Sequence, residues 1–168
     1  EKGETREELE SSLESALGVI ESKSPLGGND LFFQNVSYGN GTRNVLDILM
    51  PSEGDSKGVV LFFHGGGFIA GDKADAYNDL LLETMESLLV NKITIVSANY
   101  TLINTPGNKG VISALEDGTA VINFVQSQLN NLKIPSNKIV LAGVSAGAGI
   151  AQWNGFREAS NTQVQGVL

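Results

Sequence analysis

Cysteine is absent from this 168-residue sequence, and histidine occurs only once, at position 64. Without cysteine, the chain can form neither a disulfide framework nor a thiolate metal site. No apolar run approaches the ~20 residues that a membrane-spanning helix needs. There is no basic stripe, and the formal net charge of −8 disfavours nucleic acid and anionic lipid as partners. We therefore expect no transmembrane segment, no nucleic-acid partner, no metal and no cofactor.

The composition is 41% apolar and 18% charged, which is typical of one soluble globular domain. The sequence begins at Glu1 and lacks the basic and then apolar stretch of a signal peptide. Its localisation stays open between the cytoplasm and secretion after removal of a signal.

The spacing of apolar residues in the amino-terminal segment predicts an amphipathic helix over residues 5–22. Thr5 and Glu8 match a capping box at its start. We interpret its acidic face as a solvated surface, with a lid or substrate-entrance role as the alternative. Residues 1–27 would form this helix and a linker, with a possible contribution to a cap, and residues 28–168 the amino-terminal part of the main α/β domain.

From residue 31 onward, the pattern predicts a hairpin followed by alternating strands and helices. This order is typical of an α/β fold with a mostly parallel sheet and helices on both faces. Residues 164–168 resemble the start of one more strand, so we expect the chain to be the amino-terminal part of a longer fold. The expected strands are 31–38, 43–50, 59–63, 93–98 and 138–144, and the expected helices are 74–90, 111–129 and 146–159.

The most informative stretch is Gly143-Val-Ser-Ala-Gly147, which follows an apolar strand pattern and precedes a helical one. In the G-x-S-x-G nucleophile elbow, a serine occupies a strained turn between a strand and a helix, so that its hydroxyl projects outward. Gly143 and Gly147 would allow the strand and the helix to approach closely. Ser145 is therefore a candidate nucleophile, although such a short pattern also arises by chance.

A second stretch, His64-Gly-Gly-Gly-Phe68, follows the first buried strand and would expose backbone N–H groups. Such a loop can hold a phosphate or stabilise an oxyanion. A dinucleotide site would need an acidic residue at the end of the next strand, where the sequence reads Ser97-Ala-Asn-Tyr100. A phosphate-binding P-loop would need Gly-Lys-Ser/Thr, which is absent. The pattern favours oxyanion stabilisation.

Taken in order, these residues resemble the hormone-sensitive-lipase-like branch of the α/β-hydrolase esterases, from about Gly58 to the end of the chain. The resemblance is carried by the H-G-G-G pattern with Gly71-Asp72 and by the elbow. Two weaker matches are residues 99–102, where Thr101 stands in place of the usual arginine, and residues 114–117.

The resemblance implies that Ser145 attacks an ester carbonyl and that the N–H groups of Gly66, Gly67 and Ala146 bind the oxyanion. Gly65, Gly143 and Gly147 would support the two turns. Loss of one oxyanion donor typically lowers turnover by ~10²–10³.

Three polar residues have supporting interpretations. His64 would hold the glycine loop by hydrogen bonding and would not be the catalytic base, or it is simply a satisfied buried histidine. Asp72 would tether the loop. Asp117 would serve structure near the site, or lie on the surface of its helix. We expect Trp153 and Phe156 to be core residues, not substrate contacts.

The sequence departs from the family pattern after Ser145, because serine needs an adjacent base and α/β-hydrolases supply Asp/Glu and then His downstream. The 23 residues after Ser145 contain no histidine, and their only acidic residue is Glu158.

Three explanations account for the missing residues. The chain is an amino-terminal fragment completed by a second chain that carries Asp and His, or a shortened chain, or a hydrolase-like protein that binds small molecules without turnover. The favoured function is a serine carboxylesterase acting on small or short-chain acyl esters; on its own, this chain would show at most trace activity.

Overall fold

The computed structural model describes residues 3–53, 55–157 and 162–168. A six-stranded sheet forms the middle of the molecule, in the order β1-β2-β4-β3-β5-β6. The strands from β4 through β3 and β5 to β6 run parallel, whereas β2 is antiparallel to both β1 and β4. This arrangement confirms the predicted α/β fold with a mostly parallel sheet. The strands are β1 (Leu31–Ser37), β2 (Val45–Met50), β3 (Gly58–Phe63), β4 (Ile93–Ala98), β5 (Ile139–Gly143) and β6 (Gly166–Val167).

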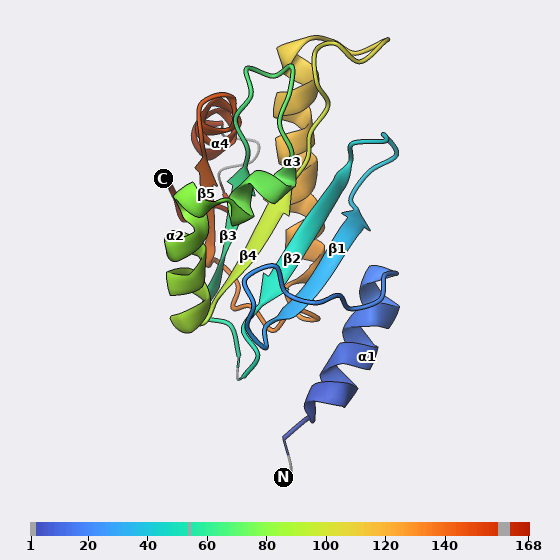
Figure 1. Cartoon of the computed structure of the whole chain (residues 1–168). Coiled ribbons are helices and arrows are strands. Elements are labelled where there is room, and N and C mark those ends of the chain that lie inside the picture. Colours follow the sequence, from blue (N-terminus) through green and yellow to red (C-terminus); the bar gives the residue numbers. More distant parts are fainter. Residues whose placement is uncertain (1–2, 54, 158–161) are drawn as a thin grey trace.

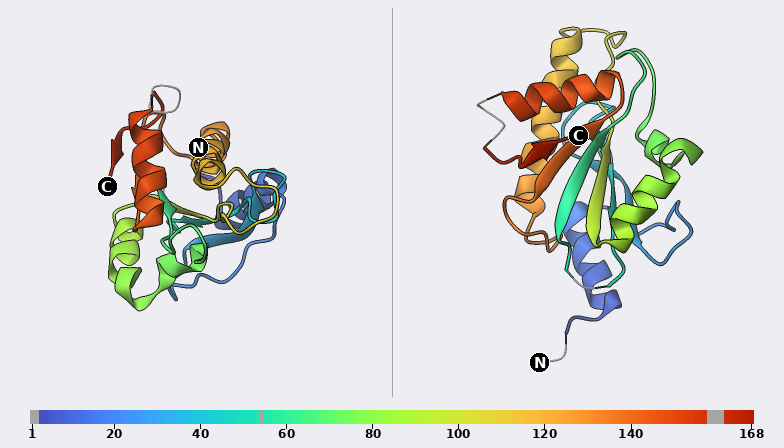
Figure 2. Two further views of the ribbon diagram at one scale, coloured as in Figure 1. Left: turned by 90° about the horizontal axis from the view of Figure 1, so that it is seen from above. Right: turned by 90° about the vertical axis from the view of Figure 1, so that its left-hand side faces the viewer.

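Helices cover both faces of the sheet (Figures 1 and 2). One face packs against α1 (Arg6–Leu17), α3 (Val111–Gln128) and α4 (Ala146–Phe156), and the other against the 3₁₀ helix η1 (Lys73–Tyr77) and α2 (Asp79–Val90). Because side chains alternate along a strand, each of the strands β1 to β5 supplies both cores. In β3, for example, Leu61 and Phe63 enter the larger core and Phe62 the smaller one.

The amino-terminal helix begins as the sequence predicts but ends earlier. Thr5 and Glu8 form the capping box, whereas Gly18 ends the helix in a left-handed conformation with φ of +74°. The predicted extension to residue 22 is therefore wrong, and Ile20 is 78% exposed instead of packed. A glycine can take this backbone conformation without a Cβ penalty, and the chain turns away at that point.

The predicted helix over residues 74–90 is also wrong as one element, because the structure divides it into η1 and α2. Asp72 caps η1, and the backbone of Asn78 is extended, with ψ of 156°, which breaks the helix before α2 begins. Leu80 consequently points outward and is 87% exposed.

Toward the carboxyl terminus, α4 ends at Phe156; the predicted helix runs to residue 159, and residues 158 and 159 lie outside the described residues. Trp153 packs against the core as expected. The same expectation is wrong for Phe156, which ends the helix and is 79% exposed. The last predicted strand is present as β6, paired with β5. Among the described residues, no helix is both long and apolar enough to cross a membrane.

Candidate active site

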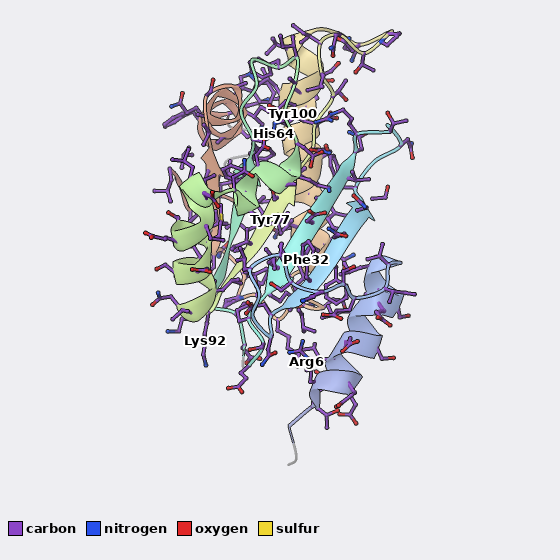
Figure 3. All side chains as sticks on the ribbon, viewed as in Figure 1. Arg6, Phe32, His64, Tyr77, Lys92 and Tyr100 are labelled. Carbon is purple, nitrogen blue, oxygen red and sulfur yellow. The ribbon has the colours of Figure 1, made fainter. Side chains whose placement is uncertain are left out.

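The glycine loop, residues 64–71, and the elbow, residues 143–147, meet at one edge of the sheet. Strands β3 and β5 are adjacent and parallel, and Phe63 pairs in register with Gly143. The amide of Val144 donates to the carbonyl of Phe63 at 3.2 Å. Because the two segments leave the carboxyl ends of neighbouring parallel strands, they emerge side by side, where open α/β sheets bind ligands. In Figure 3, His64 is labelled at this end of the sheet, and Arg6 of α1 at the opposite end.

The backbone of Ser145 is strained, with φ of +53° and ψ of −116°. A non-glycine residue with positive φ stores energy that the surrounding structure must hold, and such residues cluster at functional sites. Within the described residues, the hydroxyl of Ser145 makes no hydrogen bond, and the residue is exposed. The candidate nucleophile therefore projects from the turn without a partner that could take its proton.

Close backbone contacts explain the two glycines of the elbow. A Cβ at Gly143 would lie 2.3 Å from the carbonyl carbon and oxygen of Gly147. A Cβ at Gly147 would lie 1.9 Å from the carbonyl oxygen of Phe63. The first turn of α4 therefore packs directly on the end of β3, which leaves no room for a side chain.

The glycine loop turns back on itself through positive-φ positions. Gly66, Gly67 and Gly71 have φ of +120°, +62° and +99°, and the carbonyl of Gly66 accepts hydrogen bonds from the amides of Ile69 and Ala70. A Cβ built on Gly65 would lie 3.5 Å from the Cβ of Ser145, so the loop begins in contact with the elbow. The structure thus brings these two predicted parts of the site together.

Among the described residues, the three predicted oxyanion donors have unpaired amides, and Ala146 is buried whereas the other two residues are exposed. In the described part of the chain, the amides of Gly66 and Gly67 donate no hydrogen bond, and both residues are exposed. Ala146 is the first residue of α4, where an amide has no acceptor within its own helix. Unpaired donors beside an exposed serine are suited to bind an oxygen that gains negative charge.

His64 is fully buried, and each of its two ring nitrogens has a hydrogen-bond partner. Its Nδ1 lies 2.6 Å from the carbonyl oxygen of Gly65, and its Nε2 lies 3.2 Å from Nη2 of Arg43. The ring stacks on Tyr100 at 4.4 Å, and the Tyr100 hydroxyl donates to the His64 carbonyl at 2.7 Å. Neither ring nitrogen is free to accept a proton from Ser145.

Burial lowers the pKa of His64 from its ordinary value of 6.5 because a charged imidazolium is poorly solvated there. The hydrogen bond to Gly65 opposes this effect, whereas the positive charge of Arg43 adds to it. Burial also raises the pKa of the stacked Tyr100 to about 12. At neutral pH both rings are therefore uncharged.

Asp72 and Asn99 fasten the far end of the glycine loop. The carboxylate of Asp72 accepts from the amide of Ala74 at 2.9 Å and from Nδ2 of Asn99 at 3.0 Å. Partial burial raises the pKa of Asp72, but these hydrogen bonds outweigh it and hold the pKa below the ordinary value. The other amide atom of Asn99, Oδ1, accepts from the amide of Lys73 at 2.7 Å.

A buried ion pair holds η1 on the sheet directly after the loop. Nζ of Lys73 lies 3.0 Å from Oδ1 of Asp47 on β2, and the two side chains are 9% and 1% exposed. The carboxylate of Asp47 also accepts from the Tyr77 hydroxyl and from the amide of Asn35. Every oxygen of this buried carboxylate is therefore satisfied, as a buried charge requires.

Asp117 lies on α3 and is separate from the elbow in its contacts. Its Oδ2 accepts from the amide of Thr101 at 2.7 Å, which ties the segment after β4 to α3. The described residues include no group of acidic, histidine or cysteine side chains suited to hold a metal ion.

A cleft of about 270 Å³ adjoins both the glycine loop and the elbow. It lies on the side of the sheet that carries η1 and α2, and apolar side chains of α2 form part of its wall. The lining residues are Phe62, Gly65, Gly66, Gly71, Asp75, Asn78, Leu80, Leu81 and Val144.

The sequence patterns did not indicate that Arg43 and Asn99 support the glycine loop. Their partners lie far away along the chain, 21 to 57 residues from Arg43 and 26 or 27 residues from Asn99. No local spacing signals such contacts. The one available sign was a lone arginine beside the turn of a predicted hairpin.

Comparisons with known proteins agree with this geometry. The family model described as BD-FAE matches residues 46–166. The chain is 36% identical over 110 residues to the gibberellin receptor GID1A of Arabidopsis thaliana, covering 64% of this chain and 30% of that protein. It is 35% identical over 120 residues to the isoprenylcysteine alpha-carbonyl methylesterase ICME of Arabidopsis thaliana, covering 70% of this chain and 26% of that protein.

Among solved structures, the chain is similar to esterase Est2 of Thermogutta terrifontis in its propionate-bound form. The TM-score is 0.60 at 23% identity, covering 70% of this chain and 43% of that chain. This likeness shows the fold. The chain spans less than a third of the length of the two curated relatives.

Proposed function

This chain belongs to the BD-FAE family of α/β-hydrolase esterases, and we propose that it supplies the nucleophile and the oxyanion hole of a serine carboxylesterase for small or short-chain acyl esters. The observation that carries the proposal is the strained, exposed Ser145 beside the unpaired amides of the glycine loop. Family membership and the cleft beside the elbow support it.

In the proposed reaction, Oγ of Ser145 attacks the ester carbonyl carbon while a base takes its proton. The carbonyl oxygen gains negative charge and is bound by the amides of Gly66, Gly67 and Ala146. The alcohol leaves with the proton from the base, and water then hydrolyses the acyl-serine by the same route. The products are a carboxylic acid and an alcohol.

In this proposal the base comes from outside these 168 residues. The burial of the only histidine, and the partners of both its ring nitrogens, support this. We propose that a catalytic Asp and His are supplied by a carboxyl-terminal segment or by a second chain that forms the rest of the same hydrolase. Residues 28–168 would be the amino-terminal part of that domain. Helix α1, within residues 1–27, packs near the end of the sheet opposite His64, so our proposal gives it no part in the reaction (Figure 3).

A second candidate is a protein that binds small molecules without turnover. Among the described residues, no proton acceptor contacts Ser145, which favours this candidate, and one relative carries the name of a receptor. In this case the unpaired amides and the cleft would hold a polar ligand, and Ser145 would act only as a hydrogen-bonding group.

Labelling with a fluorophosphonate probe separates the two candidates. The native protein should be purified from its source, its subunit masses measured intact, and the labelled peptide mapped. The esterase proposal predicts labelling at Ser145 in a complex or chain that contains more than these 168 residues. A saturable small-molecule ligand in a sample that stays unlabelled would contradict the esterase and favour the receptor.

A further inference from the structure

Arg43 joins three segments that are far apart in the sequence. It lies in the turn between β1 and β2 and is half-buried. Its Nε donates to the carbonyl of Tyr100 at 2.8 Å, just after β4. Its Nη2 donates to the carbonyl of Gly71 at 3.0 Å and faces Nε2 of His64 at 3.2 Å. His64 and Gly71 are the first and last residues of the glycine loop, so one guanidinium holds both ends.

The chemistry of arginine fixes the protonation of His64. A guanidinium has only donors and stays protonated in proteins. Nε2 of His64 must therefore accept, which leaves the ring proton on Nδ1. That nitrogen lies 2.6 Å from the carbonyl oxygen of Gly65 and can donate to it. The two contacts agree with one neutral tautomer and exclude the other.

The acceptors around Arg43 are uncharged. Among the described residues, no carboxylate lies within ion-pair distance of the guanidinium, and its three acceptors are two carbonyls and an imidazole nitrogen. A planar fork with several fixed donors suits this arrangement, whereas the compact ammonium of lysine does not. The contacts are those of a clamp on the loop.

We propose that Arg43 is a positioning residue that clamps the two ends of the glycine loop and holds His64 as the neutral Nδ1–H tautomer. Gly66 and Gly67, which are exposed and whose amides donate no hydrogen bond within the described residues, lie between the clamped ends. The clamp itself does not depend on esterase activity, whereas its effect on a reaction rests on the proposed function.

Nitrogen NMR of the 168-residue chain tests the clamp directly, because the single histidine makes the ring signals unambiguous. At pH 7.5, wild type should show one neutral tautomer, protonated at Nδ1. In Arg43→Met, the two ring nitrogens should shift toward averaged values, and the Gly66 and Gly67 amide signals should move. Arg43→Lys should give the same loss. Lys109→Met removes a cation that is 72% exposed and should change none of these signals.

A wild-type His64 protonated at Nε2 would overturn the proposal, even if every Arg43 variant failed to fold. A folded Arg43→Met with unchanged ring and glycine signals would also overturn it. If the native protein proves to be an esterase, Arg43→Met should lower kcat about 10-fold or more with little change in KM. Absence of esterase activity in wild type would contradict the proposed function and leave the tautomer measurement to decide the clamp.

Discussion

The elbow and the glycine loop meet at one edge of the sheet, but different forces hold them. The elbow is fixed by contact between backbones: Gly143 and Gly147 touch neighbouring carbonyls where a Cβ would be 2.3 Å or less away. The glycine loop has equally close backbone contacts, since a Cβ on Gly66 or Gly71 would lie 2.1 or 2.3 Å from a carbonyl oxygen. Unlike the elbow, it is also held by polar side chains from distant segments, namely Arg43, Asn99 and the Asp47–Lys73 pair. Both segments should therefore be sensitive to added volume, but only the loop should also be sensitive to loss of charge or hydrogen bonds.

The largest effect is expected for Gly147→Ala. Its Cβ would lie 1.9 Å from the carbonyl oxygen of Phe63, and a backbone atom cannot move aside as a flexible side chain can. We expect the loss in the free energy of unfolding, measured by denaturant titration, to exceed the ~1–3 kcal/mol typical of overpacking and to exceed the loss for Lys73→Met. A stability within 1 kcal/mol of wild type would show that the elbow tolerates a shift, and our comparison would fail.

Lys73→Met should have the next largest effect, because it removes the only cation paired with the buried carboxylate of Asp47 among the described residues. Removing one member of a buried ion pair typically costs about 3–5 kcal/mol. Denaturant titration measures this cost, and amide NMR should show changes at Gly66 and Gly67 with little change at residues 145–147. Equal changes in both segments would contradict the separate support that we infer.

The matched control is Lys109→Met, which breaks a pair whose side chains are 72% and 52% exposed. Exposed ion pairs contribute about 0–1 kcal/mol, so the unfolding free energy should stay close to that of wild type.

Much of this architecture could be predicted from the sequence. Apolar strands alternating with helical periodicity indicated the parallel sheet, and the short patterns around Ser145 and His64 indicated which strand ends would meet. The helix break at Asn78 was missed, because residues 74–90 keep an apolar periodicity across a backbone that turns extended at one position. Arg43 was missed because its partners are distant in sequence, and only the fold brings them together.

A smaller effect is expected in the pH dependence of stability, through the buried His64 at the start of the glycine loop. Burial and the charge of Arg43 hold the pKa of folded His64 below 6.5. The carboxylates of Asp72 and Asp75 partly oppose this shift. Tyr100 stacks on the ring. At pH values between the folded pKa and 6.5, His64 is protonated more in the unfolded chain than in the folded one. The contribution of His64 to the unfolding free energy is therefore complete above pH 6.5 and falls as the pH drops from 6.5 to the folded pKa. Proton NMR should give a His64 titration midpoint below 6.5; a midpoint at or above 6.5 would contradict the buried, clamped ring.

The smallest effect is expected for Gly149→Ala, one turn into α4. Its Cβ would meet only Cζ of Phe68, at an ordinary contact distance of 3.7 Å, and alanine favours a helix over glycine. We expect a gain of about 0.5–1 kcal/mol in unfolding free energy. Destabilisation comparable to that of Gly147→Ala would show that helix α4 as a whole, and not the elbow contact, is intolerant of added volume.

Our central proposal is that this chain carries the nucleophilic serine and the oxyanion donors, and that no base to activate the serine lies within its described residues. Hydrolysis of p-nitrophenyl acetate by the purified 168-residue chain, verified by intact mass, tests it most directly. We predict a trace rate that Ser145→Ala leaves unchanged. Rapid turnover that Ser145→Ala abolishes would contradict the claim, because a group within these residues would then be acting as the base.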